Sequence, residues 1–348
     1  MTLRFGLIGA GGIGAVRAQA LTRSANCTLV AVHDVDPARA RQAAPQAAFH
    51  ADVASLLTSP DIDAVVIATP PQFHERLAID AMEAGKHVLV EKPMAASVEA
   101  CRAMTETAKR TGRTLAVGFN HRYFEALKLL RDTVASGELG TLSHVRAYAG
   151  HMGLAEFKAP WMYDPQVMGG GALFDNGIHV LDLVRYVMGD VTEVFGHALH
   201  RVWNLPAEDN ALALLRNADG VVGSLQASWS EWKGYQFHIE AYGAHGMARA
   251  YYAPMQATVI TMDKPGGARR VQRLFYPKAM LREKLQGWQS TVIAAFNEEF
   301  DDFIAATRGE AGSGRAASGV DGLRSVEVAK AVYESGASGR AVMLEPLS

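Results

Sequence analysis

A glycine-rich segment in the middle of the chain carries a carboxylate and an imidazole four residues apart. Gly169, Gly170 and Gly171 precede Asp175 and His179, and the apolar residues around them suit a helix. On a helix, residues i and i+4 share one face, so the carboxylate can hold the imidazole in one tautomer and stabilise its cation. The second ring nitrogen is then prepared as a general base, as the loss of a hydride from an alcohol requires.

Two other interpretations of this segment stay open. Asp182 lies three residues beyond His179, so Asp175, His179 and Asp182 would share a face as metal ligands. One histidine and two carboxylates from a single helix form a sparse set, and no second ligand-rich segment accompanies them, so we expect no metal. The composition of the helix also suits a histidine with a structural role in a core.

A second glycine run stands near the start of the chain, between an apolar strand pattern and a helical one. Gly9, Gly11 and Gly14 form the pattern GxGxxG, with Gly12 and Ile13 inside the loop. The first glycine permits a tight turn, the second lets a pyrophosphate approach the backbone, and the third lets the helix pack on the sheet. The segment therefore predicts a dinucleotide-binding loop.

An aspartate follows this loop at the end of the next predicted strand. Asp34 lies 20 residues beyond Gly14, where a carboxylate accepts hydrogen bonds from the adenosine ribose. Because a carboxylate there repels a 2′-phosphate, we expect NAD, with NADP less favoured. Arg39 and Arg41 follow closely and could pair with such a phosphate. The structural alternative is that Asp34 caps the turn at residues 34–37.

Two further polar segments stand at the carboxyl ends of predicted strands, where open α/β sheets bind ligands. The first carries Thr69, Pro70 and His74, and the second carries Glu91 and Lys92. We expect both to contact the cofactor. A lysine at a strand terminus can also steady a substrate hydroxyl or move a proton. A surface lysine paired with its neighbouring glutamate is the structural alternative.

The first 120 residues alternate short apolar runs with helical patterns, which is typical of a parallel sheet covered by helices on both faces. The predicted strands are residues 3–8, 28–33, 64–68, 87–91 and 115–119, and the predicted helices are 12–22, 73–84 and 97–111. This order predicts a doubly wound α/β domain whose strand ends carry the polar segments.

From residue 121 to residue 348 the pattern changes to alternating strands separated by glycine-containing turns, which indicates antiparallel hairpins. We expect strands at 143–149, 192–199, 211–217, 220–229, 236–241 and 246–251, and helices at 124–135 and 320–335. The simplest architecture is an open, mainly antiparallel sheet with one face exposed or covered by a partner. Trp229 and Trp232 lie at a strand end and fit a core or an interface equally well.

Composition excludes several classes of protein. The chain has 348 residues with 34 basic and 36 acidic side chains, so its formal charge of −2 gives no reason to expect nucleic acid. Two cysteines exclude a disulfide framework and fit a reducing, cytoplasmic compartment. No apolar run reaches the roughly 18 residues that span a membrane, and the glycine-interrupted start does not read as a signal peptide.

Taken together, these segments resemble the glucose–fructose oxidoreductase/inositol dehydrogenase (Gfo/Idh/MocA) family. The resemblance is carried by residues 9–14, 34, 68–70, 85–93 and 117–122, and by the segment 169–179. It implies a Rossmann domain that binds NAD(P) at residues 1–120 and an α+β domain for substrate and assembly at 121–348. It also implies a catalytic set of Lys92, Asp175 and His179.

Several other side chains are candidates for the substrate site. Asn120 and Arg122 follow the last strand of the first domain and could contact the nicotinamide ribose or the substrate. Trp161 and Tyr163 precede the glycine run and could stack on the apolar face of a sugar ring, and His151 could reach the same cleft.

The residues and the resemblance together predict an NAD-dependent oxidoreductase acting on a secondary hydroxyl of a sugar, sugar derivative or cyclitol. One alternative is a glycoside hydrolase that uses NAD for transient oxidation and elimination. Another is a non-catalytic NAD-binding regulator, against which the intact Lys92, Asp175 and His179 argue. We also expect a homodimer or homotetramer, joined through the outer face of the antiparallel sheet.

Overall fold

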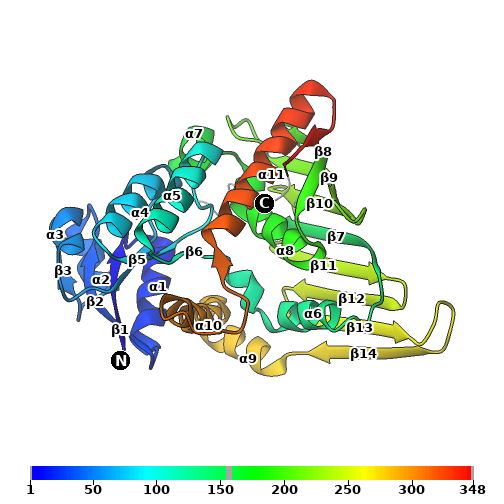
Figure 1. The fold of residues 1–348 in the computed structure, drawn as a ribbon, viewed down its shortest axis with the longest axis horizontal. Coiled ribbons are helices and arrows are strands. Elements are labelled where there is room, and N and C mark those ends of the chain that lie inside the picture. Colours follow the sequence, from blue (N-terminus) through cyan, green and yellow to red (C-terminus); the bar gives the residue numbers. More distant parts are fainter. Residues whose placement is uncertain (1, 154–158, 346–348) are drawn as a thin grey trace. The chain divides into compact units, whose positions relative to one another are not determined.

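The computed structural model describes residues 2–153 and 159–345. These residues divide into two units, drawn in sequence colours in Figure 1. The first unit contains Met1–Tyr123 and Arg282–Leu323, and the second contains Phe124–Leu281 and Arg324–Ser348. The sequence-based boundary near residue 120 assigns residues 282–323 to the second domain, whereas in the structure they belong to the first unit.

Within the described residues of the first unit, a seven-stranded sheet runs in the order β15-β6-β5-β4-β1-β2-β3. Its strands are β1 (Leu3–Ile8), β2 (Cys27–His33), β3 (Ala48–Phe49), β4 (Ala64–Ile67), β5 (His87–Val90), β6 (Leu115–Val117) and β15 (Ala317–Ser318). Neighbours are parallel except β15, which pairs antiparallel with β6. Every residue of β4 is buried, which explains its continuous apolar run. The predicted doubly wound sheet is confirmed.

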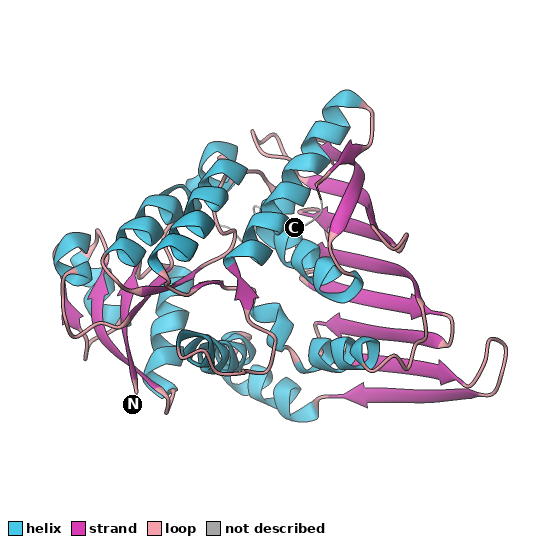
Figure 2. Ribbon diagram, in the orientation of Figure 1, coloured by secondary structure: helices cyan, strands magenta, loops and turns pink. Residues whose placement is uncertain are grey.

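Helices cover this sheet on both sides (Figure 2). They are α1 (Gly12–Arg23), α2 (Pro37–Ala43), α3 (Val53–Leu57), α4 (His74–Glu83), α5 (Val98–Thr111) and α10 (Gln289–Thr307), with short 3₁₀ turns at Pro71–Phe73 and Asn120–Tyr123. Ser97 caps α5 by accepting a hydrogen bond from the Ala100 N–H, and Gly112 ends that helix in the left-handed region.

Helix α10 explains why residues 282–323 join the first unit. It packs along α1, and its aromatic side chains enter the core under the first strand. The ring of Phe5 lies 5.6 Å from that of Phe300 and 5.8 Å from that of Phe303. Burying three large aromatic side chains in one cluster is a strong apolar driving force.

Within the described residues of the second unit, a nine-stranded sheet runs in the order β14-β13-β12-β11-β7-β10-β9-β8-β16. Its strands are β7 (Leu142–Gly150), β8 (Val191–Leu199), β9 (Asn210–Asn217), β10 (Val222–Ser228), β11 (Gln236–Gly243), β12 (Gly246–Tyr252), β13 (Gln256–Met262), β14 (Arg269–Phe275) and β16 (Val342–Met343). All neighbours are antiparallel except β10 and β7. The predicted open, mainly antiparallel sheet is confirmed, and β13 and β14 extend it beyond the predicted strands.

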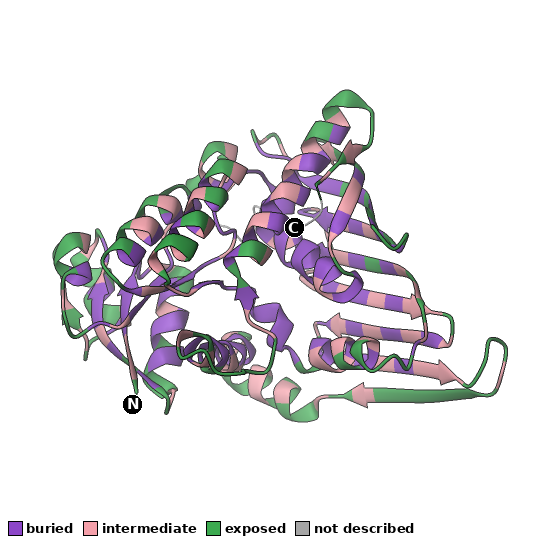
Figure 3. Ribbon diagram, viewed as in Figure 1, coloured by how far each residue is buried: buried purple, intermediate pink, exposed green. Residues whose placement is uncertain are grey.

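Among the described residues of the second unit, helices cover one face of this sheet. Helix α8 (Ile178–Met188) packs on β7, β10 and β11, and α6 (Glu125–Ala135) packs on β12 and β13. Burial therefore alternates along strands such as β9, as the mixed colours of Figure 3 show. The remaining helices are α7 (Pro165–Met168), α9 (Pro277–Gln286), α11 (Gly319–Ser338) and a 3₁₀ turn at Pro160–Tyr163.

The helix predicted after the glycine run begins differently from an ordinary α-helix. Leu173–Gly177 forms a π-helical turn, and α8 follows it directly. At the start of this turn, the N–H groups of Phe174 and Asp175 both donate to the Gly171 carbonyl, 3.0 Å away in each case, as 3₁₀- and α-type bonds. Wider turns such as the π-helical one are rare and occur mostly at functional sites. Elsewhere, no helix within the described ranges is long and apolar enough to cross a membrane.

Candidate functional site

In the first glycine run, two glycines lie tightly against backbone atoms, and two have open space where a side chain would begin. Gly9 has a φ of +93°, and a Cβ there would lie 2.7 Å from the Ala68 carbonyl oxygen. A Cβ on Gly14 would lie 2.1 Å from the Gly9 carbonyl oxygen. At Gly11 and Gly12, no described atom comes within 4 Å of the Cβ position. The loop thus fits the approach of a pyrophosphate to bare backbone at the start of α1.

Asp34 supports this loop from the end of β2. The N–H of Ala10 donates to its Oδ2 over 2.7 Å, and the N–H of Asp36 donates to its Oδ1 over 2.9 Å. The carboxylate therefore caps the turn, as the structural alternative expected, and also holds the glycine loop. Arg39 stands 3.9 Å from Oδ1, whereas Arg41 stacks on an aromatic ring of β3.

The loop after β4 presents a buried hydroxyl and is tied to the loop after β5. Oγ1 of Thr69 is buried and has no hydrogen-bond partner among the described residues, so it can serve a bound ligand. The ring of His74 is fully buried, with Nε2 2.8 Å from the Thr69 carbonyl and Nδ1 3.1 Å from the Pro93 carbonyl. Burial lowers the pKa of His74. This histidine links the loop after β4 to the loop after β5. Pro70 precedes the 3₁₀ turn Pro71–Phe73, which ends at His74.

Glu91 and Lys92 directly follow β5, next to a cluster of buried charged side chains. Arg17 is fully buried in α1, donates from Nε to Glu91 Oε1 over 2.6 Å, and also pairs with Glu299 of α10. The second oxygen of Glu91 accepts the N–H of Lys92 over 3.2 Å. Burial, with the charge of Lys92 as the smaller cause, lowers the pKa of His121 to about 3. Lys92 therefore neighbours a neutral imidazole, and the glutamate is engaged by an arginine.

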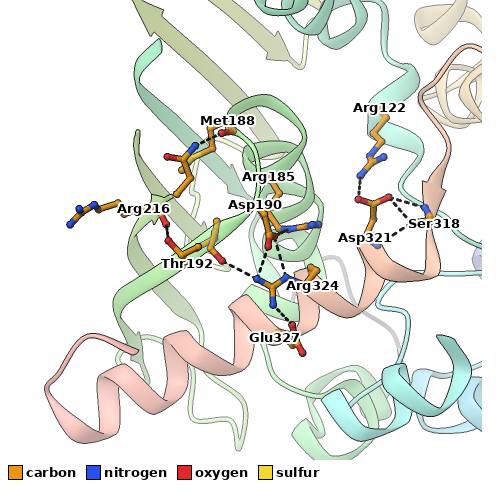
Figure 4. Close-up of polar contacts among 12 residues, drawn as sticks. Arg122, Arg185, Met188, Asp190, Thr192, Arg216, Ser318, Asp321, Arg324 and Glu327 are labelled. Atoms are coloured by element: carbon orange, nitrogen blue, oxygen red, sulfur yellow. Dashed lines mark hydrogen bonds and ion pairs between the residues drawn. The ribbon is translucent and has the colours of Figure 1, made fainter. Parts of the chain in front are cut away.

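The segment after β6 contains the other two candidates from the first unit. Asn120 and Arg122 are both buried in the turn Asn120–Tyr123. The guanidinium of Arg122 pairs with Asp321 over 3.4 Å, as Figure 4 shows, and reaches the carbonyls of Arg315 and Ala316. Arg122 is thus engaged with the segment around β15.

In the second unit, a buried glutamate shapes the run of three glycines. Gly169 ends α7 with a φ of +94°. Glu208 accepts the N–H of Gly171 over 2.6 Å and the N–H of Leu173 over 2.9 Å, and it also accepts the hydroxyl of Tyr333. A Cβ on Gly171 would lie 2.1 Å from the Glu208 carbonyl oxygen. No larger residue fits at this position, and the run leads directly into the π-helical turn.

Asp175 lies in that turn and collects hydrogen bonds from two distant segments. Nε2 of His151, just after β7, lies 2.8 Å from its Oδ2, and Nε1 of Trp229, just after β10, donates to the same oxygen over 3.1 Å. The N–H of Gly153 donates to His151 Nδ1 over 2.9 Å. All three side chains are buried, with Asp175 6% exposed. The carboxylate is held as an acceptor in a largely dry environment.

Aromatic rings border this carboxylate. Tyr163 packs edge-on against Trp229 with ring centres 5.7 Å apart. Burial, and to a smaller degree the charge of Asp175, raises the pKa of Tyr163, so its hydroxyl stays protonated at neutral pH. Trp161, two residues earlier, is 36% exposed. The structure thus brings His151, Tyr163 and Asp175 together in one place around the Trp229 ring.

His179 occupies the first turn of α8 and is 5% exposed, while Asp182 of the same helix is fully buried. Between Asp175 and His179, the Nδ2 of Asn176 is buried without a hydrogen-bond partner among the described residues, so it can donate to a ligand. Within the described ranges, no group of three or more His, Cys, Asp or Glu side chains is arranged to hold a metal ion.

An ion network fixes the far end of α8. Asp190 accepts Nε of Arg185 over 3.1 Å and forms a two-point pair with Arg324 of α11, with its closer contact at 2.7 Å (Figure 4). Arg324 also pairs with Glu327 over 2.6 Å. The helix that carries His179 is therefore anchored by charged groups at its C-terminus.

Sequence reasoning missed the residues that support the site. Trp229 was assigned equally to a core or an interface, and Glu208 and Arg17 were not singled out. None of them belongs to a motif with fixed spacing, since each meets its partner through sheet pairing or helix packing. Two signals were available, namely an arginine in a mostly apolar stretch of α1 and a glutamate just before an apolar strand.

Comparison with known proteins gives consistent results over the whole chain. Residues 3–119 match the model of an oxidoreductase family with an NAD-binding Rossmann fold, and residues 127–249 match the GFO/IDH/MocA C-terminal domain. An inositol 2-dehydrogenase from Rhizobium meliloti (strain 1021) is 30% identical over 353 residues, covering 99% of this chain and 100% of that protein. A myo-inositol 2-dehydrogenase from Thermotoga maritima is 28% identical, covering 99% of each. The structure of a levoglucosan dehydrogenase in complex with NADH aligns with a TM-score of 0.86 and 26% identity, covering 100% of each chain.

Proposed function

The chain belongs to the GFO/IDH/MocA family of NAD-binding oxidoreductases, and from this premise we propose that it oxidises a secondary hydroxyl group of a sugar, sugar derivative or cyclitol. An NAD-dependent oxidoreductase acting on CH–OH groups follows from that membership. The substrate class and the roles of individual residues are the proposal.

The observation that carries the proposal is the set of groups around Asp175. A buried carboxylate stands one turn ahead of His179 and is flanked by His151 and by the ring of Tyr163. Convergent polar groups beside aromatic rings suit a ligand that has several hydroxyls on one face and C–H groups on the other. A polyol ring has this character.

We propose that residues 1–120 hold NAD and that residues 121–348 bind substrate. The cofactor contacts are assigned to Gly9, Gly11, Gly12, Ile13, Gly14, Asp34, Thr69, Pro70, His74, Glu91, Lys92 and Asn120. The open Cβ positions at Gly11 and Gly12 and the buried hydroxyl of Thr69 support this assignment. His74 and Glu91 would act by fixing the loops that they bridge. Held by these residues, NAD would supply the acceptor for the hydride of the substrate carbon.

Three residues carry the proposed chemistry. His179 accepts the hydroxyl proton as general base, and Asp175 orients the imidazole and stabilises its cation. Lys92 supplies a positive charge that stabilises the developing negative charge on the substrate oxygen. Its neighbour His121 is neutral and so adds no second positive charge beside Lys92.

The substrate contacts are assigned to Lys92, Arg122, His151, Trp161, Tyr163, Asp175 and His179. The partly exposed Trp161 offers a ring face, and Tyr163 offers a hydroxyl that stays protonated. Arg122, paired with Asp321, would act indirectly by fixing the segment around β15. Relatives named inositol 2-dehydrogenase and levoglucosan dehydrogenase support a cyclitol or sugar as substrate.

The test is a screen of cyclitols, sugars and glycosides with NAD and with NADP, following the reduced cofactor and the products together. We expect stoichiometric NADH and a keto product from at least one free polyol, with NADP slower. Aglycone release without net NADH would replace the proposal by the glycoside hydrolase. Tight NAD binding with no turnover of any substrate would indicate a regulator.

We also propose a homodimer or homotetramer formed through the outer face of the second sheet. Phe195 and Leu214 are paired across β8 and β9 on that face and are 39% and 55% exposed. Leu212 and Val222 add to the same apolar surface, at 42% and 41%. Monomers rarely expose clusters of this kind. Light scattering at micromolar concentration should show an oligomer, and a monomer would contradict the proposal.

A further inference from the structure

Trp229 is a buried residue to which the proposed chemistry assigns no role. It follows β10, has no solvent exposure and is among the largest fully buried side chains of the described chain. A buried indole requires an acceptor for its single N–H. Here the acceptor is Oδ2 of Asp175, 3.1 Å away, which is the carboxylate proposed to orient His179.

The orientation of this indole is fixed from three sides. The backbone N–H of Trp229 donates to the Asp209 carbonyl over 2.8 Å, and its carbonyl accepts Nε1 of Trp203 over 2.9 Å. The ring of Tyr163 packs edge-to-face with the indole, with ring centres 5.7 Å apart. The carboxylate of Asp209 in turn accepts the N–H groups of residues 201–203, which shapes the turn that carries Trp203. These contacts hold the indole in one orientation, with its N–H directed at Oδ2 of Asp175.

His151 directs a second N–H at the same oxygen. Because the N–H of Gly153 donates to His151 Nδ1, that nitrogen is the acceptor and Nε2 carries the proton of the neutral ring. Nε2–H then donates to Asp175 Oδ2 over 2.8 Å. Two donors on one oxygen favour the ionised carboxylate and restrain its rotation, which offsets the cost of burying its charge.

We propose that Trp229 is a positioning residue, whose indole N–H acts with His151 to keep Asp175 ionised and oriented for proton transfer at His179. The inference rests on the proposed function of Asp175. An indole neither gains nor loses a proton at working pH, so this donor is present at every pH at which the enzyme works. Tyr163, the other titratable group beside the carboxylate, stays protonated because burial raises its pKa.

Trp229→Phe separates this role from core packing, because it keeps an aromatic ring and removes the N–H. Loss of a hydrogen bond to a charged group predicts a kcat lower by about 10- to 100-fold, with NAD affinity within about twofold of parent. Without this donor, the carboxylate stabilises the imidazolium of His179 more strongly, so the acid limb of kcat/KM should move to higher pH by about half a unit or more.

Tyr148→Phe is the matched control. It removes one hydroxyl donor from a different carboxylate, Glu231 in the connection between β10 and β11, and should keep the parental rate and pH profile. In an Asp175→Asn background, Trp229→Phe should cost less than about threefold in kcat, because its effect acts through the missing carboxylate. A Trp229→Phe enzyme with parental kcat and acid limb overturns the proposal, and so does full additivity with Asp175→Asn.

A measurement without substitution of the tryptophan covers the case in which Trp229→Phe does not fold. Each of the five tryptophans gives one indole N–H signal in a ¹⁵N–¹H spectrum, and single Trp→Phe spectra at the other four positions assign the fifth by elimination. Asp175→Asn should shift the Trp229 signal more than any other, and an unmoved signal overturns the proposal. This readout needs no turnover, so a parent protein that oxidises no polyol contradicts the proposed function alone.

Discussion

The two units assemble their polar groups in different ways. In the first, the glycine loop, Asp34 and the strand-end loops follow from backbone geometry within one repeating strand–helix pattern. In the second, the groups around Asp175 come from the end of β7, the end of β10 and a π-helical turn. The first site depends on local spacing, whereas the second depends on how sheet and helix pack.

This difference has consequences for which substitutions matter. An open position in a local turn tolerates a change unless it touches the ligand, whereas a position packed against backbone does not. Gly11 and Gly171 illustrate the two cases, since a Cβ meets no described atom within 4 Å at the first and backbone at 2.1 Å at the second. Each of the following substitutions tests this contrast.

The largest effect is expected from Gly171→Ala. A methyl group against the Glu208 backbone should lower the free energy of unfolding by about 3 kcal/mol, and the midpoint of thermal unfolding by roughly 6–12 °C. Circular dichroism during heating measures the shift. Gly11→Ala is the control and should leave the midpoint within about 1 °C while weakening NAD binding roughly tenfold. Equal stability losses in both variants would remove the contrast.

Lys92→Met tests the single catalytic contribution assigned to the first unit. Loss of the charge should lower kcat by about 100-fold or more, with NAD affinity near the parental value, because the charge acts at the reacting hydroxyl. Steady-state kinetics and a cofactor titration separate the two effects. Lys109→Met, on the exposed end of α5, should behave like parent. Turnover within about threefold of parent would make Lys92 a surface lysine.

Glu299→Gln probes the charged interior of the first unit. Burial raises the pKa of Glu299 to about 7, although Arg17 opposes the shift. The folded state then holds the proton more tightly than the unfolded chain, so this group's contribution is fully present below about pH 4.5 and declines as pH rises through 7. We expect parental stability to lose about 2 kcal/mol between pH 5 and 7 from this group, and Glu299→Gln to lose less. Identical pH profiles in urea unfolding would contradict the assignment.

The smallest effect is expected from Asp34→Ser. Removing the carboxylate should narrow the preference for NAD over NADP by about tenfold, since repulsion of a 2′-phosphate disappears. Arg39, 3.9 Å from the carboxylate, is then able to pair with the phosphate. Adding Arg39→Gln should remove part of the gain in NADP affinity. Cofactor titrations at matched salt give the ratios, and equal affinities in the parent would refute the role of Asp34.

The same difference between local spacing and packing decides how much of the fold could be predicted from the sequence. Two-sided burial makes β4 and most of β5 apolar, and the glycine loop has a fixed spacing, so the fold of the first unit could be predicted. Helix α10 was overlooked, although Phe296, Phe300 and Phe303 have helical spacing. Strand β14 gave no signal, because its residues are almost all exposed and three of them are arginines.

The candidate site divides in the same way. Asp175 and His179 were predicted from their spacing beside glycines and from the resemblance, Tyr163 from its place ahead of the glycine run, and His151 as able to reach the same cleft. The donor role of Trp229 could not be found, because it arises where β10 ends beside the π-helical turn. A wide turn in place of an α-helical one also has no clear mark in sequence.

The most direct test of the account is the pH dependence of kcat/KM for the parent and for His179→Asn, measured with the best polyol from the screen. With His179 as base, the parent should lose activity as pH falls and the imidazole becomes protonated. His179→Asn should lower turnover by roughly 10²–10⁴ and lose that acid limb, with NAD affinity little changed. A variant that keeps both its rate and its acid limb would show that the base lies elsewhere.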